Sequence, residues 1–89
     1  MATYAAEIPV TIEENLHLRP MQVLVEAAMR FKADLTVFRG TKRADAKSIL
    51  DVMMLAAERG PLRLLAEGAD ADQAVRAVSE LLHKELNKR

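Results

Sequence analysis

The residues best suited to chemistry lie near the N-terminus, where His17 is followed by Leu18, Arg19 and Pro20. A neutral imidazole is a nucleophile near neutral pH because its pKa is about 6.5. A guanidinium stays charged and presents a planar set of donors that matches phosphate oxygens. Phosphoryl transfer mainly requires positioning and charge stabilisation. His17 and Arg19 together therefore favour reversible phosphoryl transfer at the histidine.

An expected helix start supports the same chemistry. An apolar stripe at helical spacing predicts a helix over about residues 18–31, formed by Met21, Leu24, Val25 and Ala28. Pro20 falls in its first turn, where a missing N–H costs little, and the N–H groups of a helix start attract phosphate. The residues alone also allow a plainer interpretation, in which His17 is an ordinary loop residue and Arg19 a solvated surface charge.

Alternation of apolar and polar residues predicts strands before and after this helix. These strands cover residues 7–12, 35–38, 43–46 and 62–67, and the second and third form a hairpin around Gly40. Pro9 cannot donate to a neighbouring strand, so the first strand should lie at a sheet edge.

Two further helices are predicted from their capping residues. Ser48 is a good N-cap for a short helix that Gly60 and Pro61 should end, with Gly60 as its C-cap. Asp70 and Gln73 fit a capping box before a final helix. The element order is then β-α-β-β-α-β-α, which predicts a two-layer α+β fold in one domain over residues 1–89.

Composition narrows the class of protein. Hydrophobic residues make up 51% of the 89 residues and aromatic residues 3%, so Ala, Val, Leu, Ile and Met must form the core. Thirteen basic and thirteen acidic residues leave no net charge to attract nucleic acid or a membrane surface. Without cysteine, thiol chemistry is excluded. We expect a cytoplasmic protein with no metal, no cofactor and no membrane-spanning segment.

Three segments resemble one known family, HPr, the histidine-containing phosphocarrier of the bacterial phosphoenolpyruvate:sugar phosphotransferase system. Its phosphorylation-site motif is similar to Leu16-His17-Leu18-Arg19-Pro20, its regulatory-serine segment to Lys47-Ser48-Ile49-Leu50, and the turn before its last helix to Ala66-Glu67-Gly68-Ala69-Asp70. The spacing between the segments also matches. The resemblance implies an open-faced sandwich, with four antiparallel strands in the order 1-4-2-3 and three helices on one face.

The resemblance also implies roles for individual residues. His17 would take phosphate on Nδ1 from phosphorylated enzyme I and pass it to enzyme IIA components of sugar transporters, while Arg19 stabilises the phosphate. The chain would be a phosphocarrier rather than a stand-alone enzyme. Ser48 matches a serine that HPr kinase/phosphorylase modifies in many members. Two alternatives stay open: a regulatory binding module controlled through Ser48, and a nitrogen-type phosphotransfer branch.

The same family would dock its partners on an apolar surface around the histidine. The matching residues are Leu16, Leu18, Pro20, Lys47, Ile49, Leu50 and Met53, whereas Val52 and Ala56 are expected in the core. Three residues depart from the family's usual pattern, namely Asn15, Leu18 and Met21. A larger residue at position 18 changes the surface that partners meet.

We assign no catalytic role to the remaining residues of interest. Asp51 places a carboxylate near Ser48, which would repel a serine phosphate. His83 is expected on the surface of the last helix, and Glu13 and Glu14 in a solvated loop. Phe38 and Leu65 should face away from the core, but such isolated apolar side chains do not imply association, so we expect a monomer.

Overall fold

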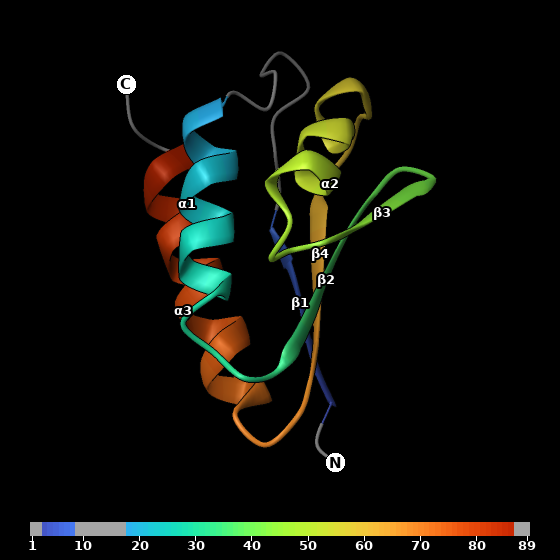
Figure 1. Cartoon of the computed structure of the whole chain (residues 1–89). Helices are drawn as coiled ribbons and strands as arrows, with labels where there is room; N and C mark the ends of the chain where they lie inside the picture. The colour runs from blue at the N-terminus through green and yellow to red at the C-terminus, as the bar shows by residue number, and fades with distance from the viewer. Residues whose placement is uncertain (1–2, 9–17, 87–89) are drawn as a thin grey trace.

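Four strands and the helices that cover one side of them form two layers in the computed structural model, which describes residues 3–8 and 18–86 (Figure 1). The strands form one antiparallel sheet in the order β1-β4-β2-β3, as the family resemblance implied. Helices α1 and α3 lie side by side on the same side of the sheet. The elements in chain order are β1 (Thr3–Ile8), α1 (Leu18–Ala28), β2 (Asp34–Arg39), β3 (Lys42–Asp45), α2 (Ile49–Met53), the 3-10 helix η1 (Met54–Ala57), β4 (Leu62–Glu67) and α3 (Ala71–Leu86).

The first strand begins earlier than its alternation pattern predicts. It runs from Thr3 to Ile8, whereas the prediction placed it at residues 7–12, of which residues 9–12 lie outside the described part of the chain. Tyr4 is paired with Ala66 and Ile8 with Leu62, so pairing with β4 outweighs the local pattern that set the expected start. The strand does lie at a sheet edge, as Pro9 indicated.

The core lies between the helices and the inner face of the sheet. It is aliphatic, as composition required. Its largest fully buried side chains are Leu24, Leu35, Leu55, Leu62, Leu64, Leu82, Val37, Val52 and Val78. Val52 is therefore in the core, and Ala56 packs against it while partly buried, as expected.

The second helix is shorter than predicted, although its start is correct. The Ser48 side chain accepts a hydrogen bond from the Asp51 N–H at 3.3 Å, which confirms the N-cap. The helix ends at Met53 and continues as a 3-10 helix to Ala57. Gly60 is not its C-cap, because the extended residue Glu58 already ends η1.

Arg39 holds the segment between α2 and β4 in place. It is buried at the end of β2 and donates Nε–H to the Gly60 carbonyl at 3.0 Å and Nη1–H to the Leu55 carbonyl at 3.2 Å. Burial lowers the pKa of the guanidinium, the charge of Arg59 lowers it further, and Glu58 opposes the shift. These two bonds join the end of β2 to η1 and to the turn before β4.

The predicted capping box of α3 does not form. The Asp70 carboxylate accepts the backbone N–H groups of Lys32 at 2.9 Å and Ala33 at 2.8 Å, and the Gln73 N–H instead bonds to Asp72 Oδ1 at 2.8 Å. Close approach of two connections makes this possible, because a Cβ added to Gly68 would lie 3.0 Å from Ala33 Cα. Asp70 therefore joins the start of α3 to the turn after α1.

Substitution of Asp70 should weaken its hydrogen bonds to Lys32 and Ala33 and so change the stability of the fold by an amount that depends on pH. Hydrogen bonds from the Lys32 N–H and then the Ala33 N–H lower the pKa of Asp70 below its ordinary 3.8 against an opposing effect of desolvation. The stabilisation is then present above the ordinary pKa and is lost as pH falls through the lower folded value. Asp70→Asn should lower the urea midpoint at pH 7, and the difference should shrink in acid.

The matched control is Asp34→Asn, at an exposed position of β2, which should leave the pH dependence of the urea midpoint close to wild type. Urea unfolding followed by circular dichroism between pH 2 and pH 7 makes the comparison. Wild-type and Asp70→Asn midpoints that differ by the same amount at every pH would contradict the role given to this carboxylate.

Candidate functional site

The start of α1 frames the candidate site. Leu18 is its first residue, and His17 and Leu16, which precede it, lie outside the described residues. The N–H groups of Leu18 and Arg19 have no carbonyl partner within the helix because they belong to its first turn, and Pro20, the next residue, has no N–H. They lie at the positive end of the helix dipole, where an anion is stabilised.

Packing fixes this helix start in position. Pro20 and Met21 are buried, and so are Leu24, Val25, Ala27 and Ala28 further along the same helix. The apolar stripe predicted from spacing is thus the face that packs on the sheet and on α3. Rigid packing directly beside the expected nucleophile favours a defined geometry for a group bound there.

Arg19 pairs with a residue that the sequence interpretation did not identify. Its Nε lies 3.4 Å from Glu85 Oε1 in the last turns of α3, where the Arg19 side chain is 64% exposed and that of Glu85 is 11% exposed. An ion pair with so exposed a partner contributes little to stability. Its effect is on position, because it holds a guanidinium with solvent-facing donors at the start of α1.

Ser48 lies at the start of α2, beside a carboxylate. Its hydroxyl is engaged as the helix cap, and Asp51 Oδ2 accepts the Asp45 N–H at 3.3 Å. The bond to Asp45 holds the Asp51 side chain at the junction of β3 and α2. A phosphate on Ser48 would therefore meet a negative charge from the first turn of its own helix.

Exposed apolar side chains mark the region around these two helix starts. The exposed fractions are 51% for Leu18, 74% for Leu50 and 45% for Met53, and these three residues are called the apolar face below. The first turn of α1 and helix α2 lie at the same end of the molecule (Figure 1). Met54, at 66%, is also exposed and was not among the expected docking residues.

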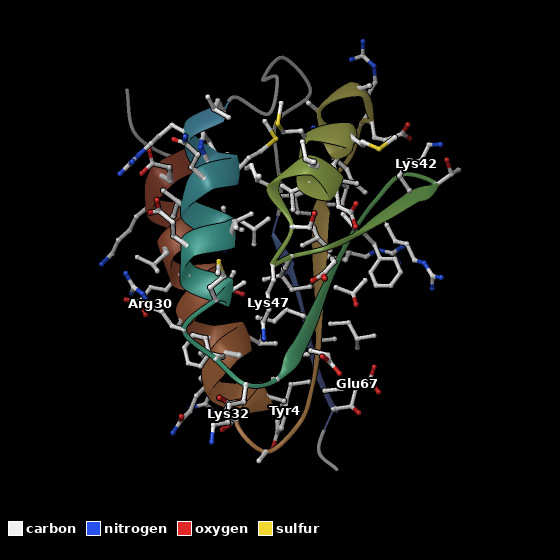
Figure 2. The ribbon with its side chains drawn as sticks, viewed as in Figure 1. Tyr4, Arg30, Lys32, Lys42, Lys47 and Glu67 are labelled. Atoms are coloured by element: carbon white, nitrogen blue, oxygen red, sulfur yellow. The ribbon has the colours of Figure 1, made fainter. Side chains whose placement is uncertain are left out.

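The other expected docking residues differ in accessibility. Ile49 is partly buried and packs against the core, and Pro20 is buried. Lys47 donates Nζ–H to the Phe31 carbonyl at 2.8 Å, which directs its side chain between the layers toward the turn after α1 (Figure 2). Ile49 and Lys47 are therefore partly exposed, whereas Pro20 is not.

Three further polar residues were considered in the sequence. His83 is exposed on α3, as expected, whereas Glu13 and Glu14 lie outside the described residues. Within residues 3–8 and 18–86, no group of three or more His, Cys, Asp or Glu side chains is placed to hold a metal ion. None of the helices there combines the length and apolar character needed to cross a membrane.

Comparison with curated proteins finds relatives of similar length and also a longer one. HPr of Mycoplasma capricolum is 36% identical over 83 residues, covering 92% of this chain and 91% of the relative. HPr of Xylella fastidiosa is 35% identical over 83 residues, with 92% and 93% covered. A multiphosphoryl transfer protein of Escherichia coli O157:H7 is 39% identical over 82 residues, which are 88% of this chain but 22% of that longer protein.

Solved structures and a family model agree with these relatives. HPr from Bacillus anthracis superposes with a TM-score of 0.77 at 32% identity, covering 91% of this chain and 98% of that one. HPr-C-His from Thermoanaerobacter tengcongensis gives 0.80 at 29% identity, with 97% and 98% covered. The model of the PTS HPr component phosphorylation site matches residues 4–84. The chain therefore belongs to the HPr family, the phosphocarrier proteins of the phosphotransferase system.

Proposed function

We propose that this protein accepts a phosphoryl group from phosphorylated enzyme I on Nδ1 of His17 and passes it to an enzyme IIA component of a sugar transporter. In the first step the Nδ1 lone pair attacks phosphorus, a P–N bond forms, and the bond from phosphorus to the donor breaks. The reverse sequence on the acceptor restores the free imidazole. The protein is a covalent carrier in the cytoplasm, with residues 1–89 acting as one domain.

The main support for this proposal is the set of hydrogen-bond donors at the start of α1. His17 immediately precedes a helix whose first-turn N–H groups lack intrahelical partners. Arg19, held by Glu85, adds a guanidinium at the same end. Donors that are already in place stabilise the charge of a transferring phosphoryl group without reorganisation.

The apolar face accounts for partner docking in this proposal. Leu18, Leu50 and Met53 are exposed near the helix start, and a flexible methionine can adapt to partners of different shape. Such a surface suits a carrier that must bind a donor and an acceptor in turn. Exclusion of water by these side chains would also protect the P–N bond during transfer.

Removal of His17 should abolish phosphorylation, whereas removal of the other histidine should not. Wild type, His17→Ala and His83→Ala are each incubated with enzyme I and phosphoenolpyruvate, and intact mass is recorded. One phosphate should add to wild type and to His83→Ala, because His83 is exposed in the last turn of α3 and does not directly precede a helix start. None should add to His17→Ala.

Phosphate that still adds to His17→Ala, or is lost only in His83→Ala, would refute the assignment of His17. A wild-type protein that stays unmodified while a control HPr is phosphorylated in the same mixture would refute the carrier function itself.

A charge on the apolar face should weaken docking without unfolding the protein. Leu50 is 74% exposed, so Leu50→Glu should leave the melting temperature nearly unchanged and raise the KM for phosphorylation by enzyme I about tenfold or more, as expected for an interface hot spot. The control is Met29→Glu, since Met29 is 67% exposed but follows the opposite end of α1. Equal KM increases in the two variants would contradict a localised docking face.

The alternative function is a regulatory binding module controlled through Ser48, and the placement of Ser48 favours testing it. Ser48→Asn keeps a residue that caps helices well but cannot accept phosphate. With ATP and an HPr kinase, wild type should be modified and Ser48→Asn should not, and Asp51→Asn should be modified faster because a repelling carboxylate is removed.

Phosphorylation at equal rates in wild type and Ser48→Asn would show that the kinase acts on another residue. Binding of a transcription regulator that requires the serine phosphate and survives His17→Ala would establish the regulatory module.

A further inference from the structure

Methionines are the side chains of this protein that oxidants attack most readily. The sequence has five methionines and neither cysteine nor tryptophan, so no thiol or indole competes with the thioethers for a peroxide. Burial divides the four methionines that lie within the described residues. Met21 is 5% exposed, whereas the exposed fractions are 67% for Met29, 45% for Met53 and 66% for Met54. A dissolved oxidant can therefore reach three of these four directly.

Two of the exposed thioethers are neighbours where α2 becomes a 3-10 helix. Met53 is the last residue of α2 and Met54 is the first residue of η1. Leu50, Met53 and Met54 follow the i, i+3, i+4 spacing that places side chains on one face of a helix. Val52 and Leu55 are completely buried and form the opposite, core-facing side. The two thioethers and Leu50 therefore share the solvent-exposed side of this segment.

The same side of the segment contributes to the apolar face on which partners dock in the proposed function. Met53 and Leu50 belong to that face, and Met54 extends it into η1. Helix α2 and the first turn of α1 lie at one end of the molecule (Figure 1). Met29 is different, because it follows Ala28 at the opposite end of α1. Equally accessible thioethers thus lie both inside and outside the expected docking region.

Oxidation would change docking rather than folding. A methionine sulfoxide is polar, whereas the thioether is a flexible apolar group. A sulfoxide oxygen that a partner buries without a hydrogen-bond donor loses its water contacts, which weakens binding. The fold keeps its packing because Val52 and Leu55, which hold this segment to the core, contain no sulfur. The expected effect of oxidation is therefore a weaker complex between intact proteins.

We propose that Met53 and Met54 form a reversible oxidation site through which peroxides weaken partner docking, an inference that rests on the proposed carrier function. The sulfur lone pair attacks one peroxide oxygen, an S–O bond forms and the O–O bond breaks. The departing oxygen takes up the proton and leaves as water, so sulfur is oxidised by two electrons and the peroxide is reduced. Methionine sulfoxide reductases reverse the step, in which two thiols become a disulfide and the oxygen leaves as water.

Peroxide treatment of three proteins provides the test. These are wild type, the double variant Met53→Leu/Met54→Leu, and Met29→Leu as the matched control at an equally exposed methionine. Leucine keeps the apolar character and approximate volume of methionine but has no sulfur. Each protein is treated with hydrogen peroxide, and peptide mass mapping locates the sulfoxides. The KM and kcat for phosphorylation by enzyme I are compared with those of the same protein before treatment.

Oxidation should raise the KM of wild type and of Met29→Leu about tenfold or more, as expected when an interface hot spot is lost. The kcat and the circular dichroism spectrum should stay close to those of the untreated proteins. Methionine sulfoxide reductases with a thiol reductant should restore the original KM. In the double variant, treatment should change the KM by no more than about twofold, since distant sites act independently within that range.

An unchanged KM in wild type whose Met53 and Met54 are mapped as sulfoxides would overturn the proposal. So would an equal rise in KM in the double variant, or a map in which Met29 is oxidised while Met53 and Met54 remain reduced. Untreated wild type that enzyme I does not phosphorylate would refute the carrier function, and this inference with it. The two failures are distinguishable because the second appears before any peroxide is added.

Discussion

Everything else in this structure depends on the packing of α1 and α3 against one side of the sheet. Each helix has a single apolar face, and each can bury it only against the sheet and the other helix. Four alanines of these two helices, Ala27, Ala28, Ala71 and Ala74, are almost completely buried. The same packing brings the start of α1 beside the last turns of α3, where Glu85 meets Arg19. It also leaves the other side of the sheet uncovered.

Polar side chains form hydrogen bonds to backbone groups in the connections between these elements. Asp70 accepts two backbone N–H groups in the turn after α1, Lys47 donates to a carbonyl of the same turn, and Arg39 donates to two carbonyls around η1. Each bond is made to a backbone group at or near a helix end or in a turn between elements. These three residues hold connections between elements outside the candidate site.

Local sequence patterns were sufficient for much of the fold. The apolar stripe of α1, the Ser48 cap and the inward face of β4 follow from spacing and residue type, and the structure confirms all three. The predictions were wrong where a residue distant in the sequence determines the contact. Asp70 was assigned to its own helix, but two N–H groups 37 and 38 residues away bind it instead. The first strand follows the register of β4, which no local alternation encodes.

At the candidate site, too, local patterns identified residues but not their long-range contacts. Arg19 was identified from its spacing to His17, but its contact with Glu85 was not, because only the packing of α1 on α3 joins residues so far apart in sequence. Lys47 lies in a segment that resembles a docking surface, yet its side chain binds the Phe31 carbonyl. The burial of Arg39 could have been predicted from the sequence, because Arg39 continues the alternation of Leu35 and Val37, which both face the core.

The central claim is that the start of α1 binds the phosphoryl group carried by the adjacent histidine. The most direct measurement compares ¹H–¹⁵N spectra of the protein before and after phosphorylation by enzyme I. The account predicts the largest shifts at the amides of Leu18 and Arg19 and at Arg19 Nε. Unchanged signals at these groups, with the main changes instead around Ser48 or His83, would contradict it.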